Sequence, residues 1–325
     1  MLDPIPVPPL LRDAIQPLAT RLHLLTLPLH IHEIVLSYAL YNLIDTVLAP
    51  LISRRLFPNH YRAFSRRTQL QWNMHVTSLV NSTFISLAAI YVLYADVDRL
   101  SDTWEQRMWG YTGAGGMVQA FGAGFFIWDL QICAANVKTL GVPDLVHALM
   151  GFIISFLGFR PFGLFYGIQY ALVELSTPFV NFHCFLNKLN KAGSTLQLVN
   201  GMILITVFGC CRLLWGSYMT KTFFGDVWTA LHAPRSSWTT YNYSPTQKPL
   251  VLQHHAEWWV GIVFLATHTV VMSLSIFWFG KMIATMRRHY AGSNGKRKAK
   301  LDDAHGNVTA STVTSLKHWA SGIDY

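Results

Sequence analysis

The sequence predicts an all-α protein: a polytopic integral membrane helix bundle with six or seven transmembrane helices. Of its 325 residues, 52% are hydrophobic and only 13% are charged, whereas a soluble domain carries about 25% charged residues. The apolar residues also lie in blocks, several of which approach the ~20 residues that a helix needs to cross the bilayer core. We therefore expect one membrane domain over residues 31–285, with no separate soluble domain.

The basic residues indicate membrane topology rather than nucleic-acid binding. The net charge is +9, but the lysines and arginines cluster beside apolar blocks, which is how orientation is encoded in membrane proteins. Such clusters also attract anionic lipid headgroups, by about 1 kcal/mol per residue. They stand at Arg54-Arg55, Arg66-Arg67, Arg287-Arg288 and Lys296-Arg297-Lys298.

Residues 1–30 form a proline-rich segment that we expect to be irregular or to lie at the membrane interface. No cleavable signal peptide is evident in it. The first candidate span, 31–52, ends at Pro50 and a pair of arginines. It contains Glu33 and Asp45, so an amphipathic interfacial helix is the alternative interpretation.

Six further spans follow from the apolar blocks and their flanking aromatic, proline and basic residues. We predict them at 72–94, 109–132, 144–159, 162–181, 196–219 and 257–283. The loops 53–71, 133–142 and 182–194 are basic and fall on the same side as the basic tail, 286–325. This pattern predicts a cytosolic C-terminus and a disordered tail.

The third span is rich in glycine, with six between residues 110 and 124. No strand precedes the run and no Gly-Lys-Ser/Thr follows it, so a phosphate-binding loop is disfavoured. Close packing of helices through small residues is the favoured interpretation.

Ionisable residues inside three spans are the candidates for chemistry: Asp129, the pair Asp144 and His147, and Glu174. Asp144 and His147 are three residues apart and so share a helix face. An imidazole near a carboxylate can act as a base, a proton relay or a nucleophile. A polar network that only specifies helix packing is the alternative, although ionisable groups within a membrane usually mark function.

The stretch from Glu174 to Leu186 places further polar groups in an apolar helix, namely Ser176, Thr177 and Asn181. Hydrocarbon cannot solvate such groups, so they need protein partners or a water-filled cavity. Pro178 should kink or end the fifth span and free backbone carbonyls.

No metal site and no cofactor is predicted. The pair His254-His255 has no third ligand at a suitable spacing, and His75 and His268 are single histidines in apolar blocks. The four cysteines also lie in or beside apolar blocks without metal-ligand spacing. The simplest interpretation is that they are small, buried core residues.

Three motifs together resemble the TLC domain, which is shared by translocation-associated membrane proteins, ceramide synthases and a neuronal-lipofuscinosis protein. They are Leu140-Gly-Val-Pro-Asp-Leu-Val-His147, Phe159-Arg-Pro-Phe162 and Glu174-Leu-Ser-Thr-Pro-Phe-Val-Asn181, preceded by Asp129. The resemblance covers about residues 65–285. It implies an endoplasmic-reticulum membrane, helices around a central cavity lined by Asp129, His147 and Glu174, and work on lipids.

The chain also departs from the ceramide synthases. They carry an adjacent pair of histidines where this chain has His147-Ala148, and aspartates downstream where it has Glu174. We therefore favour lipid handling or membrane lipid homeostasis, with membrane lipids as partners. The alternative is a ceramide-synthase-like N-acyltransferase that uses fatty acyl-CoA, with His147 as base or acyl carrier and Asp144 or Asp129 orienting it. A proton-coupled transporter is a weaker alternative, and a homo-oligomer is a further one.

Overall fold

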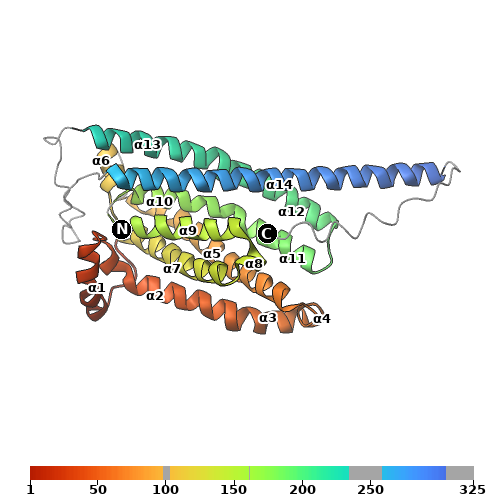
Figure 1. Cartoon of the computed structure of the whole chain (residues 1–325), viewed down its shortest axis with the longest axis horizontal. Coiled ribbons are helices and arrows are strands. Elements are labelled where there is room, and N and C mark those ends of the chain that lie inside the picture. The colour runs from red at the N-terminus through yellow and green to blue at the C-terminus, as the bar shows by residue number, and fades with distance from the viewer. Residues whose placement is uncertain (98–102, 161, 234–257, 305–325) are drawn as a thin grey trace.

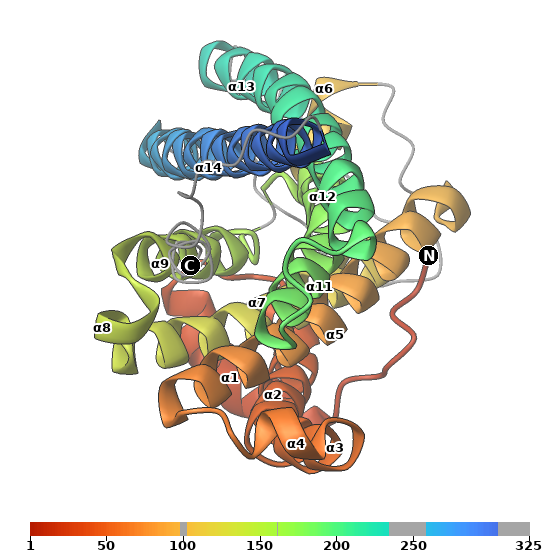
Figure 2. The ribbon, with the colours of Figure 1, turned by 90° about the vertical axis from the view of Figure 1, so that its right-hand side faces the viewer.

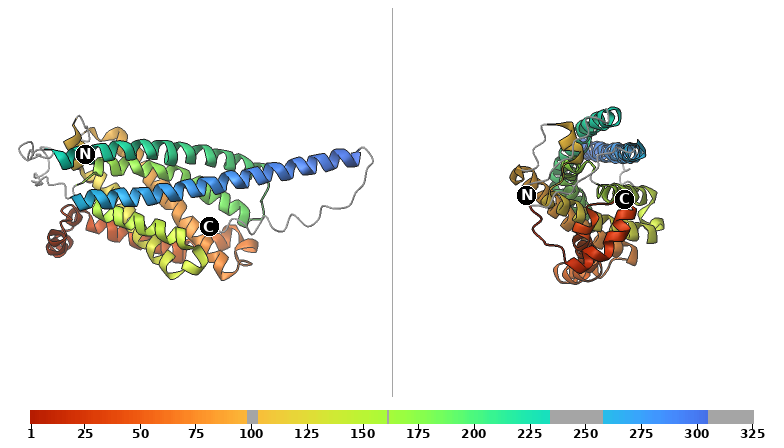
Figure 3. Two further views of the ribbon diagram at one scale, coloured as in Figure 1. Left: turned by 45° about the horizontal axis from the view of Figure 1, so that its top comes forward. Right: turned by 90° about the vertical axis from the view of Figure 1, so that its left-hand side faces the viewer.

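The computed structural model describes residues 1–97, 103–160, 162–233 and 258–304, with side chains as far as Arg287. Every regular element in these ranges is helical. The long helices run side by side along one axis, and α1 (Pro9–Arg21) lies across one end of the bundle (Figure 1, Figure 3). The all-α prediction is confirmed.

Five helical stretches are long and apolar enough to cross a membrane: Leu27–Leu56, Arg66–Ala95, Gly113–Ala135, Thr195–His232 and Trp258–Arg287. The shorter α9 (Val142–Leu157) is apolar too. A divided segment, α10 (Leu164–Tyr170), η3 (Ala171–Ser176) and α11 (Thr177–Lys188), packs among them. These seven stretches correspond in order to the seven predicted spans.

The first stretch consists of α2 (Leu27–Leu43), a π-helical turn η1 (Ile44–Leu48) and α3 (Ala49–Leu56). Its two carboxylates, Glu33 and Asp45, are 0% and 6% exposed. A helix that keeps both carboxylates inside the protein can cross hydrocarbon. This burial favours the transmembrane interpretation over the interfacial one.

The remaining helices are α5 (Arg66–Ala95), α7 (Gly113–Ala135), α12 (Thr195–Phe208), η4 (Gly209–Trp215), α13 (Gly216–His232) and α14 (Trp258–Ala304). Short helices join them: α4 (Pro58–Tyr61), α6 (Trp104–Trp109) and α8 (Val137–Leu140). The three basic loops meet at one end of the bundle, from which α14 projects (Figure 1). We call this the basic-loop end, and the end with α1 and α6 the opposite end.

Several boundaries differ from the sequence prediction. Residues 9–21 form a regular helix, α1, which rules out the irregular alternative of the prediction and leaves the interfacial one as a prediction. Pro9 occupies the first turn, where its missing N–H costs no hydrogen bond. The sixth span continues to His232 rather than ending at residue 219. Backbone helix also extends through residue 304, where a tail without secondary structure was expected from residue 286. Residues 305–325 and the histidine pair 254–255 lie outside the described ranges.

The glycines of α7 allow close approach of α2, as predicted. A Cβ at Gly116 would overlap the ring of His30, and one at Gly124 would overlap the Ser37 hydroxyl. Both partners are fully buried side chains of α2. Small residues here let two helices pack closely without a hydrophobic driving force between them. α7 packs against both α2 and α9 (Figure 2).

The fifth span is interrupted just before Pro178. The 3₁₀ segment η3 contains Glu174 and Ser176, and α11 then begins with Pro178 in its first turn. Opposite it, η4 interrupts the sixth span with a π-helical turn around Arg212. Such irregular turns inside helices often mark functional positions. Both interruptions face each other at the same depth of the bundle.

Candidate functional site

A cavity of about 190 Å³ lies among α5, α7, α9, α11 and α14, toward the basic-loop end. We call it the polar chamber. Its charged and imidazole lining comprises His75, Asp129, Asp144, His147, Glu174 and Arg212. Thr177 and Asn181 line it as well. The structure thus brings six of the seven predicted site residues to one cavity.

Ser176 is the exception, because its fully buried side chain does not line the chamber. Its hydroxyl instead accepts a hydrogen bond from Arg212 Nε at 3.0 Å. Ser176 therefore holds a lining residue in position from behind.

Glu174 is neutralised by Arg212. The guanidinium Nη2 lies 3.3 Å from Glu174 Oε1 and donates to the Thr177 hydroxyl at 3.0 Å. Thr177 in turn donates to Glu174 Oε2 at 2.7 Å. The two charged side chains are only 8% and 19% exposed. A pair buried this deeply depends on such supporting hydrogen bonds, because desolvation offsets much of the Coulombic attraction.

Arg212 was not among the residues predicted from the sequence. The signal was present, because an arginine interrupts the apolar block 201–215, and an intramembrane arginine is costly without a partner. Its distance of 38 residues from Glu174 along the chain gives no indication of the pairing. Only the packing of η3 against η4 brings the two charges together.

His147 and Asp144 share a face of α9, as their spacing predicted, and both line the polar chamber. No hydrogen bond joins them in the described part of the chain, so the expected carboxylate–imidazole pair is not formed. The His147 ring packs edge-on against Trp278 and Phe126, with centroids 5.5 and 6.1 Å apart. Its Nδ1 is buried and has no partner among the described residues.

His75, which the sequence analysis set aside as a single core histidine, also lines the chamber. Its Nδ1 lies 2.9 Å from Asn181 Oδ1, and the Asn181 amide donates to Ser78 Oγ at 3.2 Å. These bonds join α5 to α11 at the chamber wall. The expectation of a satisfied core histidine holds, but its position beside the site was not foreseen.

Two carboxylates of the chamber have no cationic partner. Among the described residues, no lysine or arginine lies within salt-bridge distance of Asp129 or Asp144. Cys133 donates a weak bond to Asp129 Oδ1 at 3.6 Å. An interior carboxylate without a cation costs free energy unless a proton or a ligand compensates it.

A second cavity, of about 230 Å³, continues from the polar chamber toward the opposite end. We call it the apolar chamber. Its walls include Val118, Gly151, Leu164, Gly167, Phe223 and Phe264. The two chambers share Phe125, His147, Glu174 and Arg212. The ion pair and the imidazole therefore stand at the junction of a polar and an apolar compartment.

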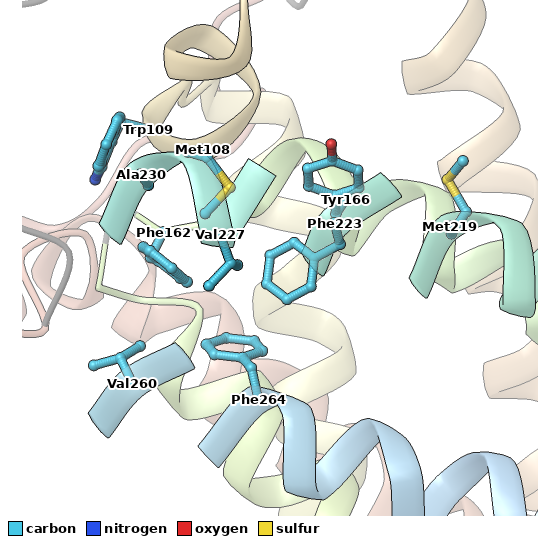
Figure 4. Close-up of a cluster of buried hydrophobic side chains, with 10 residues drawn as sticks. All are labelled: Met108, Trp109, Phe162, Tyr166, Met219, Phe223, Val227, Ala230, Val260 and Phe264. Carbon is cyan, nitrogen blue, oxygen red and sulfur yellow. The ribbon is translucent and has the colours of Figure 1, made fainter. Parts of the chain in front are cut away.

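A cluster of buried side chains lines the apolar chamber toward the opposite end. The rings of Phe162, Phe223 and Phe264 face one another between α10, α13 and α14 (Figure 4), with centroids 5.5 to 6.2 Å apart. Met108 and Trp109 of α6 cap the cluster from the end of the bundle. The arrangement joins an apolar compartment to a polar one, a combination suited to an amphipathic ligand.

The fold is a helical bundle with stretches long and apolar enough to span a membrane. Known sequences then identify the class of protein. The model of the TLC domain matches residues 71–284. The chain belongs to the TLC-domain family of membrane proteins.

The chain is similar to several fungal and animal proteins, of which most carry the TLC domain in their names. It is 33% identical to an uncharacterized TLC domain-containing protein of Schizosaccharomyces pombe, over 89% of each chain. It is 30% identical to Topoisomerase I damage affected protein 4 of Saccharomyces cerevisiae, over 61% of this chain and 71% of that one. The chain is also 27% identical to TLC domain-containing protein 4-B of Danio rerio, over 82% of this chain and 92% of that one.

Proposed function

We propose that this protein binds a membrane lipid across the two chambers and acts in membrane lipid handling or homeostasis. The observation that carries the proposal is the shared wall of the chambers, where Glu174, Arg212 and His147 meet apolar surface. A headgroup in the polar chamber would find both signs of charge. Its acyl chain would lie in the apolar chamber, out of contact with water.

The charges of the polar chamber indicate the kind of headgroup. Arg212 offers donors to a phosphate or carboxylate group, while Asp129 and Asp144 offer acceptors to an amine or hydroxyl group. A ligand with donors would supply the partners that the two carboxylates lack. The family resemblance and the basic-loop pattern support an endoplasmic-reticulum location, with the basic-loop end and the C-terminus in the cytosol.

The test is to purify the full chain and quantify its bound lipids by mass spectrometry. Glu174→Gln removes the charge that holds Arg212 in place, and we expect bound lipid per chain to fall about tenfold, which corresponds to about 1.4 kcal/mol. Asp45→Asn is the matched control, because it neutralises another buried intramembrane carboxylate that lines neither chamber. Equal lipid content in wild type and Glu174→Gln would contradict the proposal.

A second candidate function is N-acyl transfer from fatty acyl-CoA, favoured by the unpartnered Nδ1 of His147 at the chamber junction. A buried nitrogen of this kind can take a proton from an attacking amine. The test is acyl-CoA-dependent N-acylation of a long-chain base by the purified protein, compared with His147→Ala. Activity that the variant loses would favour the enzyme, whereas bound lipid without turnover would favour handling.

A further inference from the structure

A second polar cluster lies at the opposite end of the bundle, away from both chambers. It joins three parts of the chain: Asp3 of the N-terminal segment, His30 and Glu33 of α2, and Tyr111 just before α7. Each of Asp3, His30 and Glu33 offers one possible metal-ligand atom, and these three atoms lie within 4.8 Å of one another. His30 and Glu33 are fully buried.

The hydrogen bonds among these groups do not satisfy all of their polar atoms. His30 Nδ1 lies 2.6 Å from Glu33 Oε2 and 3.3 Å from Asp3 Oδ2. A single N–H at Nδ1 serves only one carboxylate well. The other Glu33 oxygen, Oε1, is buried and has no partner among the described residues. No lysine or arginine pairs with Asp3 or Glu33 in the part of the chain that the structure describes.

The surroundings of His30 are those of a metal ligand. Its second ring nitrogen, Nε2, is 2.5 Å from the Tyr111 hydroxyl, a contact that orients the ring. The ring fits only because residue 116 is glycine, since a Cβ there would overlap Nε2. Asp3 is fixed as well, because its Oδ1 accepts from the Ile5 N–H at 2.9 Å. Such outer contacts orient ligating side chains at metal sites.

We propose that Asp3, His30 and Glu33 bind a divalent transition-metal ion of the Zn²⁺ type, which fastens the N-terminal segment to α2. An imidazole with two carboxylates is a common ligand set for such ions. Two ligand atoms around one tetrahedral Zn²⁺ are about 3.4 Å apart, close to the 3.3 Å between His30 Nδ1 and Asp3 Oδ2. The 2.6 Å between His30 Nδ1 and Glu33 Oε2 is hydrogen-bond geometry, so Glu33 would ligate through Oε1 and the Nδ1–Oε2 bond would give way to the metal. The ion would neutralise both carboxylates and give Glu33 Oε1 a partner. The sequence analysis predicted no metal, because the ligands come from segments 27 residues apart with no motif spacing.

The experiment measures metal content and stability of the full chain, purified with a tag that contains no histidine and equilibrated with Zn²⁺. We expect about one Zn²⁺ per wild-type chain after removal of excess metal. Asp3→Asn and Glu33→Gln should each lower the content at least tenfold. Asp3→Asn is the safer variant for folding, because Asp3 is the most exposed of the three ligands, at 16%. Tyr111→Phe should weaken Zn²⁺ affinity about 10–100-fold.

Two controls make the outcome decisive. His23→Asn removes an exposed histidine close to the site in sequence, at a left-handed backbone position that asparagine tolerates, and should keep full metal content. A strong chelator should lower the melting temperature of the wild type but not that of Asp3→Asn. Wild-type protein that retains no Zn²⁺, variants that retain as much as the wild type, or a melting temperature insensitive to the chelator would each overturn the proposal.

Discussion

Two arginine–carboxylate pairs join helices of the bundle, one near the opposite end and one at the junction of the chambers, and they differ in how completely they are satisfied. At the opposite end, Arg107 of α6 makes two bonds to Asp226 of α13, at 2.6 and 2.8 Å, and Tyr166 donates to the same carboxylate. Neither charged residue lines a chamber. This geometry is that of a lock between helices.

Toward the basic-loop end, Arg212 makes a single, longer contact of 3.3 Å with Glu174 and shares its other donors with hydroxyl groups. Both members of the pair line the chambers, beside two carboxylates without cations. Burial of an ion pair therefore does not by itself identify a site. We interpret the complete pair away from the cavities as structural, and the pair on the cavity wall as the one that a ligand would meet under the proposed function.

The largest expected effect comes from breaking the lock. Arg107→Leu leaves Asp226 buried with only the Tyr166 hydroxyl, and we expect a loss of about 3 kcal/mol in unfolding free energy. Denaturant unfolding of the purified protein measures it. Arg12→Leu, which removes an exposed arginine that pairs with Asp13, should change stability by less than about 0.5 kcal/mol. Equal effects of the two variants would refute the structural role of the lock.

Substitutions of two glycines of α7 should have the next largest effect on stability. One glycine packs tightly against α2 and the other lines the apolar chamber. Gly116→Ala forces a Cβ against His30, and overpacking of this kind costs about 1–3 kcal/mol. Gly122→Ala meets nothing within 4 Å and should stabilise the helix by about 0.5–1 kcal/mol. We therefore expect the melting temperature to fall in Gly116→Ala and to rise in Gly122→Ala, relative to the wild type. A destabilising Gly122→Ala would mean that the chamber is filled at that position.

Much of the fold follows from the sequence alone. Apolar blocks and basic clusters located the seven long helical stretches, five of which are long and apolar enough to cross a membrane. The spacing of Asp144 and His147 placed both on one helix face. The glycine run correctly indicated close packing, although not that His30 is the side chain it accommodates. Patterns of this kind are local, because they depend on helix periodicity and on the cost of exposing charge to lipid.

The site could be predicted only in part. Residues of the fifth span were found because a proline and a carboxylate are conspicuous in an apolar block. Arg212 was missed, and so was the joint position of His75 and Asn181, because these pairings depend on which helices become neighbours. The division of the cavity into polar and apolar chambers likewise results from tertiary packing, which no single span contains.

Filling the apolar chamber should weaken lipid binding with little change in stability. Gly167 lines this chamber and Gly225 does not, and a Cβ at either position meets nothing within 4 Å. Gly167→Leu should lower bound lipid about tenfold, or about 1.4 kcal/mol, whereas Gly225→Leu should leave it unchanged. Mass spectrometry of co-purified lipid gives the readout. Unchanged lipid in Gly167→Leu would mean that acyl chains do not enter this chamber.

The smallest effect is expected from Asp129→Asn, which should raise stability and lower lipid binding. Asp129→Asn removes a buried charge that has no cationic partner, so we expect a gain of less than about 1 kcal/mol in unfolding free energy. The same change removes an acceptor for a headgroup and should lower bound lipid severalfold. Asp13→Asn, an exposed carboxylate in α1, should alter neither quantity. If Asp129→Asn instead destabilises the protein and leaves bound lipid unchanged, the carboxylate belongs to a packing network like that of Asp226. The functional contrast between the two ends of the bundle would then rest on Glu174 and Arg212 alone.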